Sequence, residues 1–173
     1  MFRHASVRLL IFLFVTLVLD ISVMPMLSIA HTQPVLIYLP VVYAALQWGA
    51  ELTLTTAIWT GVLRELASAA PAGVEISSVL LGAYLLVLMI RKMEHSPIFF
   101  RMAIAFLFVG AVRLIHLSYC LFLGSQGLPA GQLFAETAGC AFYSAVLCPV
   151  FFVVTALWFR DRQMLRQLEL FNR

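Results

Sequence analysis

Six long apolar runs, separated only by short turns, constrain this chain more than any other feature of its sequence. About 20 apolar residues cross the hydrocarbon core of a bilayer as a helix. The runs are Val7–Leu27, Pro34–Trp48, Leu52–Ala70, Val74–Ile90, Ile98–Leu123 and Leu133–Phe159. The second and fourth are short and would need little tilt or a locally thinner bilayer. The pattern predicts an all-α integral membrane protein, folded as a six-helix transmembrane bundle.

The composition excludes a soluble enzyme or binding domain. Of the 173 residues, 63% are hydrophobic and 11% are charged, and the mean hydropathy is +1.01. A soluble domain has about half apolar and a quarter charged residues, and one of this size could not bury so much apolar surface. The net charge of +3 is scattered along the chain without a basic face, which argues against nucleic acid as a partner. Lipid is therefore the expected surrounding.

The sequence divides into two parts. Residues 1–160 hold the six runs and form the predicted transmembrane domain. Residues 161–173 form a short basic tail with apolar residues at helical spacing, typical of an amphipathic helix at the membrane surface. We expect the first run to remain as a span, because Asp20 and Pro25 separate it from the small residues that a signal peptidase would need.

Basic residues orient the bundle. Of the 11 Lys and Arg residues, all but Arg64 and Arg113 lie before the first run, around the loop between the fourth and fifth runs, or after the sixth. In a six-span bundle these positions share one side, and the opposite loops carry no Lys or Arg. The side with the basic loops faces the cytoplasm. We therefore predict that both termini are cytoplasmic.

Six ionisable residues inside the predicted spans form the candidate site. They are Asp20, Arg64, Glu65, Arg113, His116 and Glu136. At about 1.5 Å per residue, the first four lie roughly 20 Å from the cytoplasmic side of a core of about 30 Å. All six are therefore expected in the outer half of the membrane. Charges in hydrocarbon are costly, so such residues face a protein interior, a cavity or a partner.

Two interpretations of this intramembrane polar layer remain open. It could be an ion or proton pathway, or a structural layer that locks the helices or receives a partner helix. A proton relay needs acids in both leaflets, and the inner halves of the runs lack them, which favours the second interpretation. For internal pairing, we expect Glu65 to be held by Arg113 or Arg64, with Asp20 and Glu136 as alternative acids.

No arrangement in the sequence supports catalysis or cofactor binding. The motifs HExxH and GxSxG and a phosphate-binding glycine loop are absent. His116 and Cys120 lie four residues apart, but two ligands without a third do not predict a metal site. The three cysteines lie in apolar runs, and we interpret them as apolar filler. We predict a protein that is not an enzyme and has no cofactor.

Small residues and prolines predict details of helix packing. The pairs Ala45/Gly49, Ala57/Gly61, Ser78/Gly82 and Ala141/Ala145 have the fourfold spacing that allows two helices to approach closely. Pro40 and Pro149 lie inside predicted spans and are expected to kink them.

The stretch Gly61–Gly73, GVLRELASAAPAG, carries a resemblance to a known family. It is similar to the pattern G-x-L-x-D-L-x-S-x-x-P-x-G of MreD, the bacterial rod-shape-determining membrane proteins. Glu65 takes the aspartate position, and the turn is matched by Ser68, Pro71 and Gly73.

The likeness covers the whole chain in size and layout, with two departures outside the motif. Val35 replaces an acidic residue that often follows the proline at the start of the second run. Ser144 stands where an asparagine is common.

The resemblance implies a subunit of the cell-elongation machinery in the bacterial cytoplasmic (inner) membrane. Members of the family bind MreC, a single-span protein with a large periplasmic domain. That assembly links MreB filaments to peptidoglycan synthesis by RodA and penicillin-binding protein 2. The family is not known as an enzyme, and its fold resembles the substrate-binding subunits of energy-coupling-factor vitamin transporters.

The alternative function is a small-molecule, vitamin-type binding subunit of a membrane transporter. Such a subunit needs an outward-facing pocket of a few hundred Å³ with convergent polar groups. A scaffold would instead expose a groove as wide as a helix.

Overall fold

The computed structural model describes residues 2–28, 32–68, 72–90, 98–122 and 130–159. The helices are α1 (Phe2–Ser22), η1 (Met24–Leu27), η2 (Leu36–Tyr38), α2 (Leu39–Gln47), α3 (Ala50–Ala67), α4 (Val74–Ile90), α5 (Ile98–Phe122) and α6 (Ala130–Phe159), where η marks a short 3₁₀ helix. Within these ranges there is no β-strand. The predicted all-α fold is confirmed. The predicted tail, residues 161–173, lies outside the described residues.

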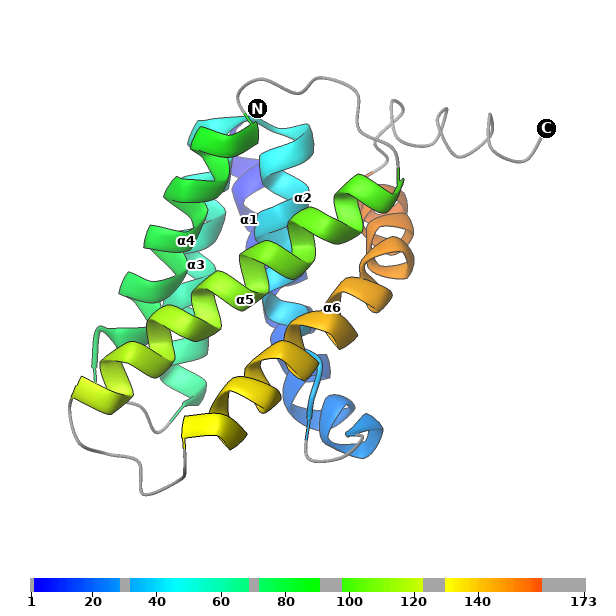
Figure 1. Cartoon of the computed structure of the whole chain (residues 1–173). Helices are drawn as coiled ribbons and strands as arrows, with labels where there is room; N and C mark the ends of the chain where they lie inside the picture. Colours follow the sequence, from blue (N-terminus) through cyan, green and yellow to red (C-terminus); the bar gives the residue numbers. More distant parts are fainter. Residues whose placement is uncertain (1, 29–31, 69–71, 91–97, 123–129, 160–173) are drawn as a thin grey trace.

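The α-helices run alternately up and down between the two ends of the molecule (Figure 1). The first helix begins and the last helix ends at the same end of the bundle. α3 packs along α4, and α5 packs along α6. The short helix α2 lies between these pairs and contacts α3, α4, α5 and α6. The second apolar run therefore forms the centre of the bundle.

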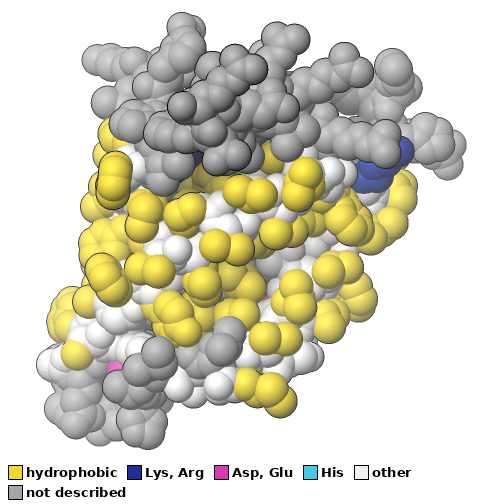
Figure 2. Space-filling model, turned by 90° about the vertical axis from the view of Figure 1, so that its right-hand side faces the viewer, with side chains coloured by type: hydrophobic (Ala, Val, Ile, Leu, Met, Phe, Trp, Pro, Cys, Tyr) yellow, Lys and Arg dark blue, Asp and Glu magenta, His cyan; other side chains and the backbone are white. Residues whose placement is uncertain are grey.

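Three helical segments are long and apolar enough to cross a membrane. They are Val7–Met26, Phe99–Tyr119 and Leu133–Phe159. Leu36–Gln47 and Val74–Ile90 are apolar but shorter. Hydrophobic side chains cover much of the face shown in Figure 2. Exposed apolar side chains on α1 include Val7, Ile11, Phe14 and Val18. This surface is what a membrane protein presents to lipid.

The chain enters the bundle interior before it becomes helical. Val35 is extended, with φ −113° and ψ 95°, and the stretch from Pro34 to Ala44 is buried throughout. Only nine residues of the second run, Leu39–Gln47, form an α-helix. The expected kink at Pro40 is wrong, because this proline lies in the first turn of α2. A missing N–H leaves no helical hydrogen bond unmade there. Pro149 does lie inside α6.

Glycines bring two pairs of helices together, at two of the four pairs of small residues that the sequence indicates. A Cβ atom added at Gly61 on α3 would lie 2.8 Å from the Cα of Ile76 on α4. One added at Gly82 on α4 would lie 2.6 Å from Cγ2 of Val112 on α5. Both distances are shorter than van der Waals contact. The close approach of α3 to α4 therefore leaves no room for a side chain at position 61.

Candidate functional site

The buried entry to α2 is held by side chains from two other helices. The backbone N–H of Leu36 donates to Oδ1 of Asp20 on α1 at 2.7 Å, and that of Val35 donates to Oγ of Ser144 on α6 at 2.9 Å. The first N–H groups of a helix have no partner within it, and buried ones must find a partner elsewhere. Asp20 and Ser144 supply those acceptors inside the bundle.

Ser144 is fixed in this role by its own hydrogen bond. Its hydroxyl donates to the carbonyl of Cys140, one turn earlier in α6, at 2.8 Å. The hydroxyl oxygen is thereby oriented to accept from Val35. The two positions at which this sequence departs from the MreD pattern outside the motif, Val35 and Ser144, thus contact each other directly.

Asp20 also forms an ion pair across the bundle. Its Oδ2 lies 3.0 Å from Nη1 of Arg64 on α3, and its side chain is 4% exposed. One carboxylate therefore joins three elements: α1, the entry to α2, and α3. Sequence analysis placed Asp20 as an alternative acid for the intramembrane arginines, and in the structure it is the acid closest to Arg64.

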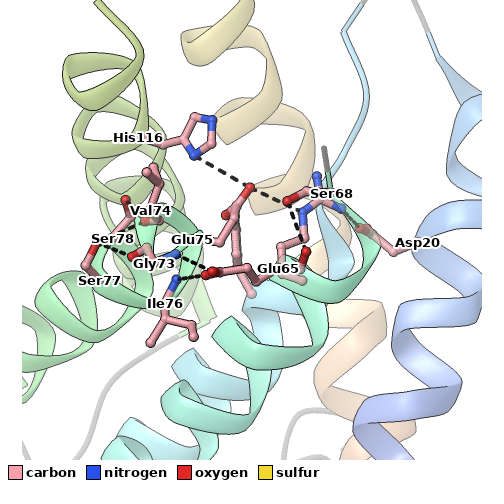
Figure 3. A network of polar contacts seen from close by, with 12 residues as sticks. Asp20, Glu65, Ser68, Gly73, Val74, Glu75, Ile76, Ser77, Ser78 and His116 are labelled. Atoms are coloured by element: carbon pink, nitrogen blue, oxygen red, sulfur yellow. Dashed lines mark hydrogen bonds and ion pairs between the residues drawn. The ribbon is translucent and has the colours of Figure 1, made fainter. Parts of the chain in front are cut away.

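Glu75 extends this network to α4 and α5. It lies in the first turn of α4 and is 3% exposed. Its Oε2 accepts from the hydroxyl of the fully buried Tyr38 at 3.1 Å. Its Oε1 lies 3.9 Å from Nε of Arg64 and 3.5 Å from Nδ1 of His116. Figure 3 shows His116 pointing toward Glu75.

Sequence reasoning did not include Glu75, Tyr38 or Ser144 among the site residues. Glu75 stands two residues after the turn glycine, Gly73, so it resembles a loop residue at the membrane surface. One signal could have found it: an acid in the first turn of a helix that begins among other intramembrane charges. Tyr38 and Ser144 carry no such signal, since their partners lie 37 and 109 residues away.

Glu65 has a different role from the one expected. It takes neither Arg113 nor Arg64 as an ion-pair partner within the described part of the chain. Its carboxylate instead accepts from the backbone N–H of Gly73, and from that of Ile76 at 3.3 Å. These donors belong to the N-terminal end of α4, so Glu65 caps the next helix (Figure 3). Glu65 caps α4 and does not pair with an arginine, because those N–H groups have no partner within the helix.

The rest of the turn motif serves the same connection. Ser68 ends α3, and its backbone N–H donates to the carbonyl of Glu65 at 3.3 Å. Gly73 has φ +91°, a conformation that residues with a Cβ rarely adopt. Its carbonyl accepts from the backbone N–H of Ser77 at 3.0 Å. Pro71 lies outside the described residues.

Replacing Glu65 with alanine should destabilise the protein by about 1 kcal/mol, the typical loss when a helix cap is removed. Glu65→Gln should lose less, because its amide oxygen still accepts one hydrogen bond. The midpoint of thermal unfolding in detergent, followed by tryptophan fluorescence, measures both. Glu51→Gln, which changes an exposed acid on the same helix, is the control.

The same variants test the partner of Glu65. If it caps α4, the losses of Glu65→Gln and Arg113→Gln should add. If the double variant loses clearly less stability than the two single losses added together, the Glu65–Arg113 ion pair expected from the sequence would be supported instead.

Arg113 and Glu136 line a separate polar cavity between α5 and α6, with a volume of about 220 Å³. Polar groups in its wall come from α5, from α6 and from the segment before α2. They are Arg113, His116, Glu136, Thr137, Thr32 and Gln33. The buried Cys140 lines the same wall beside Arg113. Glu136 is exposed at the rim.

The six predicted residues therefore fall into three groups. Asp20, Arg64 and His116 meet in one network through Glu75. Arg113 and Glu136 face the cavity, which His116 also lines. Glu65 caps α4. Among the described residues, no group of three or more His, Cys, Asp and Glu is placed to hold a metal ion.

The carboxylates of Asp20 on α1 and Glu75 on α4 accept hydrogen bonds from Leu36 and Tyr38 of η2 and from Arg64 of α3. Glu75 also lies 3.5 Å from Nδ1 of His116 on α5. That arrangement suits the locking of helices, the structural interpretation of the polar layer.

Comparisons with protein-family models, with curated proteins and with solved structures find no match for this chain.

Proposed function

We propose that this protein is a non-enzymatic membrane scaffold of the bacterial cell-elongation machinery. In this role it binds MreC and helps to couple MreB filaments to lateral peptidoglycan synthesis by RodA and penicillin-binding protein 2. The proposal includes the six-span fold that the MreD resemblance implies, similar to the substrate-binding subunits of energy-coupling-factor transporters. It places the protein in the cytoplasmic membrane with both termini in the cytoplasm.

The observation that carries the proposal is the structure of the stretch that resembles MreD. Gly61 allows α3 to approach α4, Glu65 caps α4, and Gly73 takes the positive φ of the turn. The residues that match the family pattern thus act together in one connection. If the likeness of this stretch to the MreD pattern were due to chance, the matching residues would not be expected to have linked structural roles.

Alternating helix directions support the six-span topology (Figure 1). Reporter fusions after Arg173 and within residues 91–97 should report the cytoplasm, and one within residues 124–131 should report the periplasm. A periplasmic reporter at Arg173 would contradict the topology.

Depletion of the protein tests the scaffold role. In its rod-shaped host, depletion should round the cells, because lateral wall growth would lose its membrane subunit. Purification of the tagged chain in mild detergent should recover MreC, and Asp20→Ala should reduce the recovery of both proteins. Normal rods after depletion, with no MreC in the purified sample, would overturn the scaffold proposal.

A second candidate function is the vitamin-type binding subunit of a transporter, and the cavity between α5 and α6 favours it. Its volume of about 220 Å³ and its convergent polar groups approach what such a subunit needs. Depletion would then leave rod shape unchanged and abolish the uptake of one small molecule. Measuring cell shape and uptake in one depletion strain separates the two functions.

A further inference from the structure

The cavity between α5 and α6 contains an arginine whose hydrogen-bonding capacity is only partly used. Arg113 lines the cavity next to Cys140, whose thiol is a weak acceptor. Its Nε is buried without a hydrogen-bond partner among the described residues. Within those residues it also has no carboxylate oxygen within 4.0 Å, in contrast to Arg64. Asp20 and Glu75 lie next to Arg64 instead, which leaves the guanidinium of Arg113 at the cavity wall.

A buried guanidinium selects a particular ligand chemistry. It presents five N–H donors in a planar fork that matches the oxygens of a carboxylate or phosphate group. Charge-assisted hydrogen bonds of this kind are about twice as strong as neutral ones, and a surrounding of low dielectric strengthens them further. Thr137 adds a hydroxyl to the same wall. These donors suit the binding of an oxyanion.

The size and the rim of the cavity restrict the ligand further. A volume of about 220 Å³ is below the usual range for drug-sized ligands, about 300–1,000 Å³. It therefore suits a small metabolite or a lipid headgroup. Glu136 lines the cavity with an exposed side chain. A ligand that enters past this carboxylate gains if it carries a hydroxyl or ammonium donor next to the oxyanion.

We propose that this cavity binds a small oxyanion that carries a neighbouring hydrogen-bond donor, with Arg113 clamping the oxyanion and Glu136 accepting from the donor. A phosphate ester of glycerol has this chemistry, both as a free molecule and as a lipid headgroup. The proposal goes beyond the scaffold role and does not depend on it, since it rests on the cavity and its side chains alone.

The test uses the full chain in a neutral detergent, at constant ionic strength set with chloride. Glycerol 3-phosphate should raise the midpoint of thermal unfolding in a saturable way, because a ligand that binds only the folded state stabilises it. Arg113→Gln should weaken the apparent affinity by roughly 10-fold or more, the loss expected for hydrogen bonds to a charged group. Arg101→Gln, which changes another arginine of α5 outside the cavity wall, should leave the affinity unchanged.

Two further variants keep the test decisive if Arg113→Gln fails to fold. Arg113→Lys keeps the charge and loses the fork, so binding should persist with a weaker affinity. Glu136→Gln changes an exposed side chain and should fold normally. It should tighten the binding of sulfate, an oxyanion that carries no hydrogen-bond donor at neutral pH, more than that of glycerol 3-phosphate. Equal changes for both ligands would contradict the assigned role of Glu136.

A second arm separates the two sources of the ligand. The chain is placed in bilayer discs of phosphatidylcholine, with or without a quarter of phosphatidylglycerol. Stabilisation by phosphatidylglycerol that Arg113→Gln abolishes, without a response to glycerol 3-phosphate, identifies a lipid headgroup. A response to glycerol 3-phosphate alone identifies a soluble ligand. The proposal is overturned if neither compound stabilises the protein, or if Arg113→Gln responds as strongly as the unchanged chain.

Discussion

Asp20→Ala is expected to lower the free energy of unfolding by about 3–5 kcal/mol, the loss typical of breaking a buried charge pair. The change strands Arg64, whose Nη1 lies 3.0 Å from Oδ2 of Asp20. It also removes the acceptor of the Leu36 N–H group, which is buried at the entry to α2. Snorkelling of the arginine toward water would place the loss at the lower end of this range. Unfolding by dodecyl sulfate in mixed micelles measures it.

Comparison with Asp20→Asn separates the two roles of this carboxylate. Asparagine keeps an oxygen for Leu36 and removes the charge that pairs with Arg64, so its loss should be smaller than that of alanine. The double variant Asp20→Asn, Arg64→Gln should lose less than the two single losses added together. Glu51→Gln, an exposed acid on α3, should change stability by no more than about 0.5 kcal/mol. A similar small effect for Asp20→Ala would contradict the locking role of the network.

Glu75→Ala is the second large expected loss, about 3 kcal/mol. It leaves the hydroxyl of Tyr38 buried without its acceptor, which typically costs about 1–3 kcal/mol. It also removes the carboxylate that lies between Arg64 and His116, and stranded buried charge adds to the loss. The same micelle titration measures the effect.

A double variant measures how much of the stability lost in Glu75→Ala comes from the contact with the Tyr38 hydroxyl. When Tyr38→Phe is combined with it, the stranded hydroxyl is gone, and the combined loss should be smaller than the sum. Glu136→Gln supplies the matched control, because this acid is exposed. Equal losses at Glu75 and Glu136 would show that burial of the network does not set the stability.

The helices could largely be predicted from the sequence, because continuous apolar runs bounded by Gly, Pro and charge leave little choice. The fourth run, Val74–Ile90, coincides with α4. The second run, Pro34–Trp48, was harder. Its residues are buried on every side whether extended or helical, so hydrophobicity alone could not place the start of α2. The extended entry at Val35 depends on acceptors from α1 and α6.

The partners within the polar layer were predicted less well, for a related reason. The depth estimated from position in each run was the same for Asp20 and Arg64, and in the structure these residues form an ion pair. The same estimate of depth predicted that an arginine would pair with Glu65. In the structure two backbone N–H groups donate to the Glu65 carboxylate instead. Residue identity does not show which backbone N–H groups lack a partner, so counting side-chain charges cannot detect them.

The buried entry to α2 has a consequence for biosynthesis. The acceptor for Val35 lies 109 residues further along the chain. At about 5–20 residues per second, a ribosome needs roughly 5 to 20 seconds to make that stretch. Until Ser144 has been translated and α6 inserted, the nascent chain holds this N–H group without its native acceptor. The native hydrogen bond at the entry to α2 can therefore form only after α6 has been made.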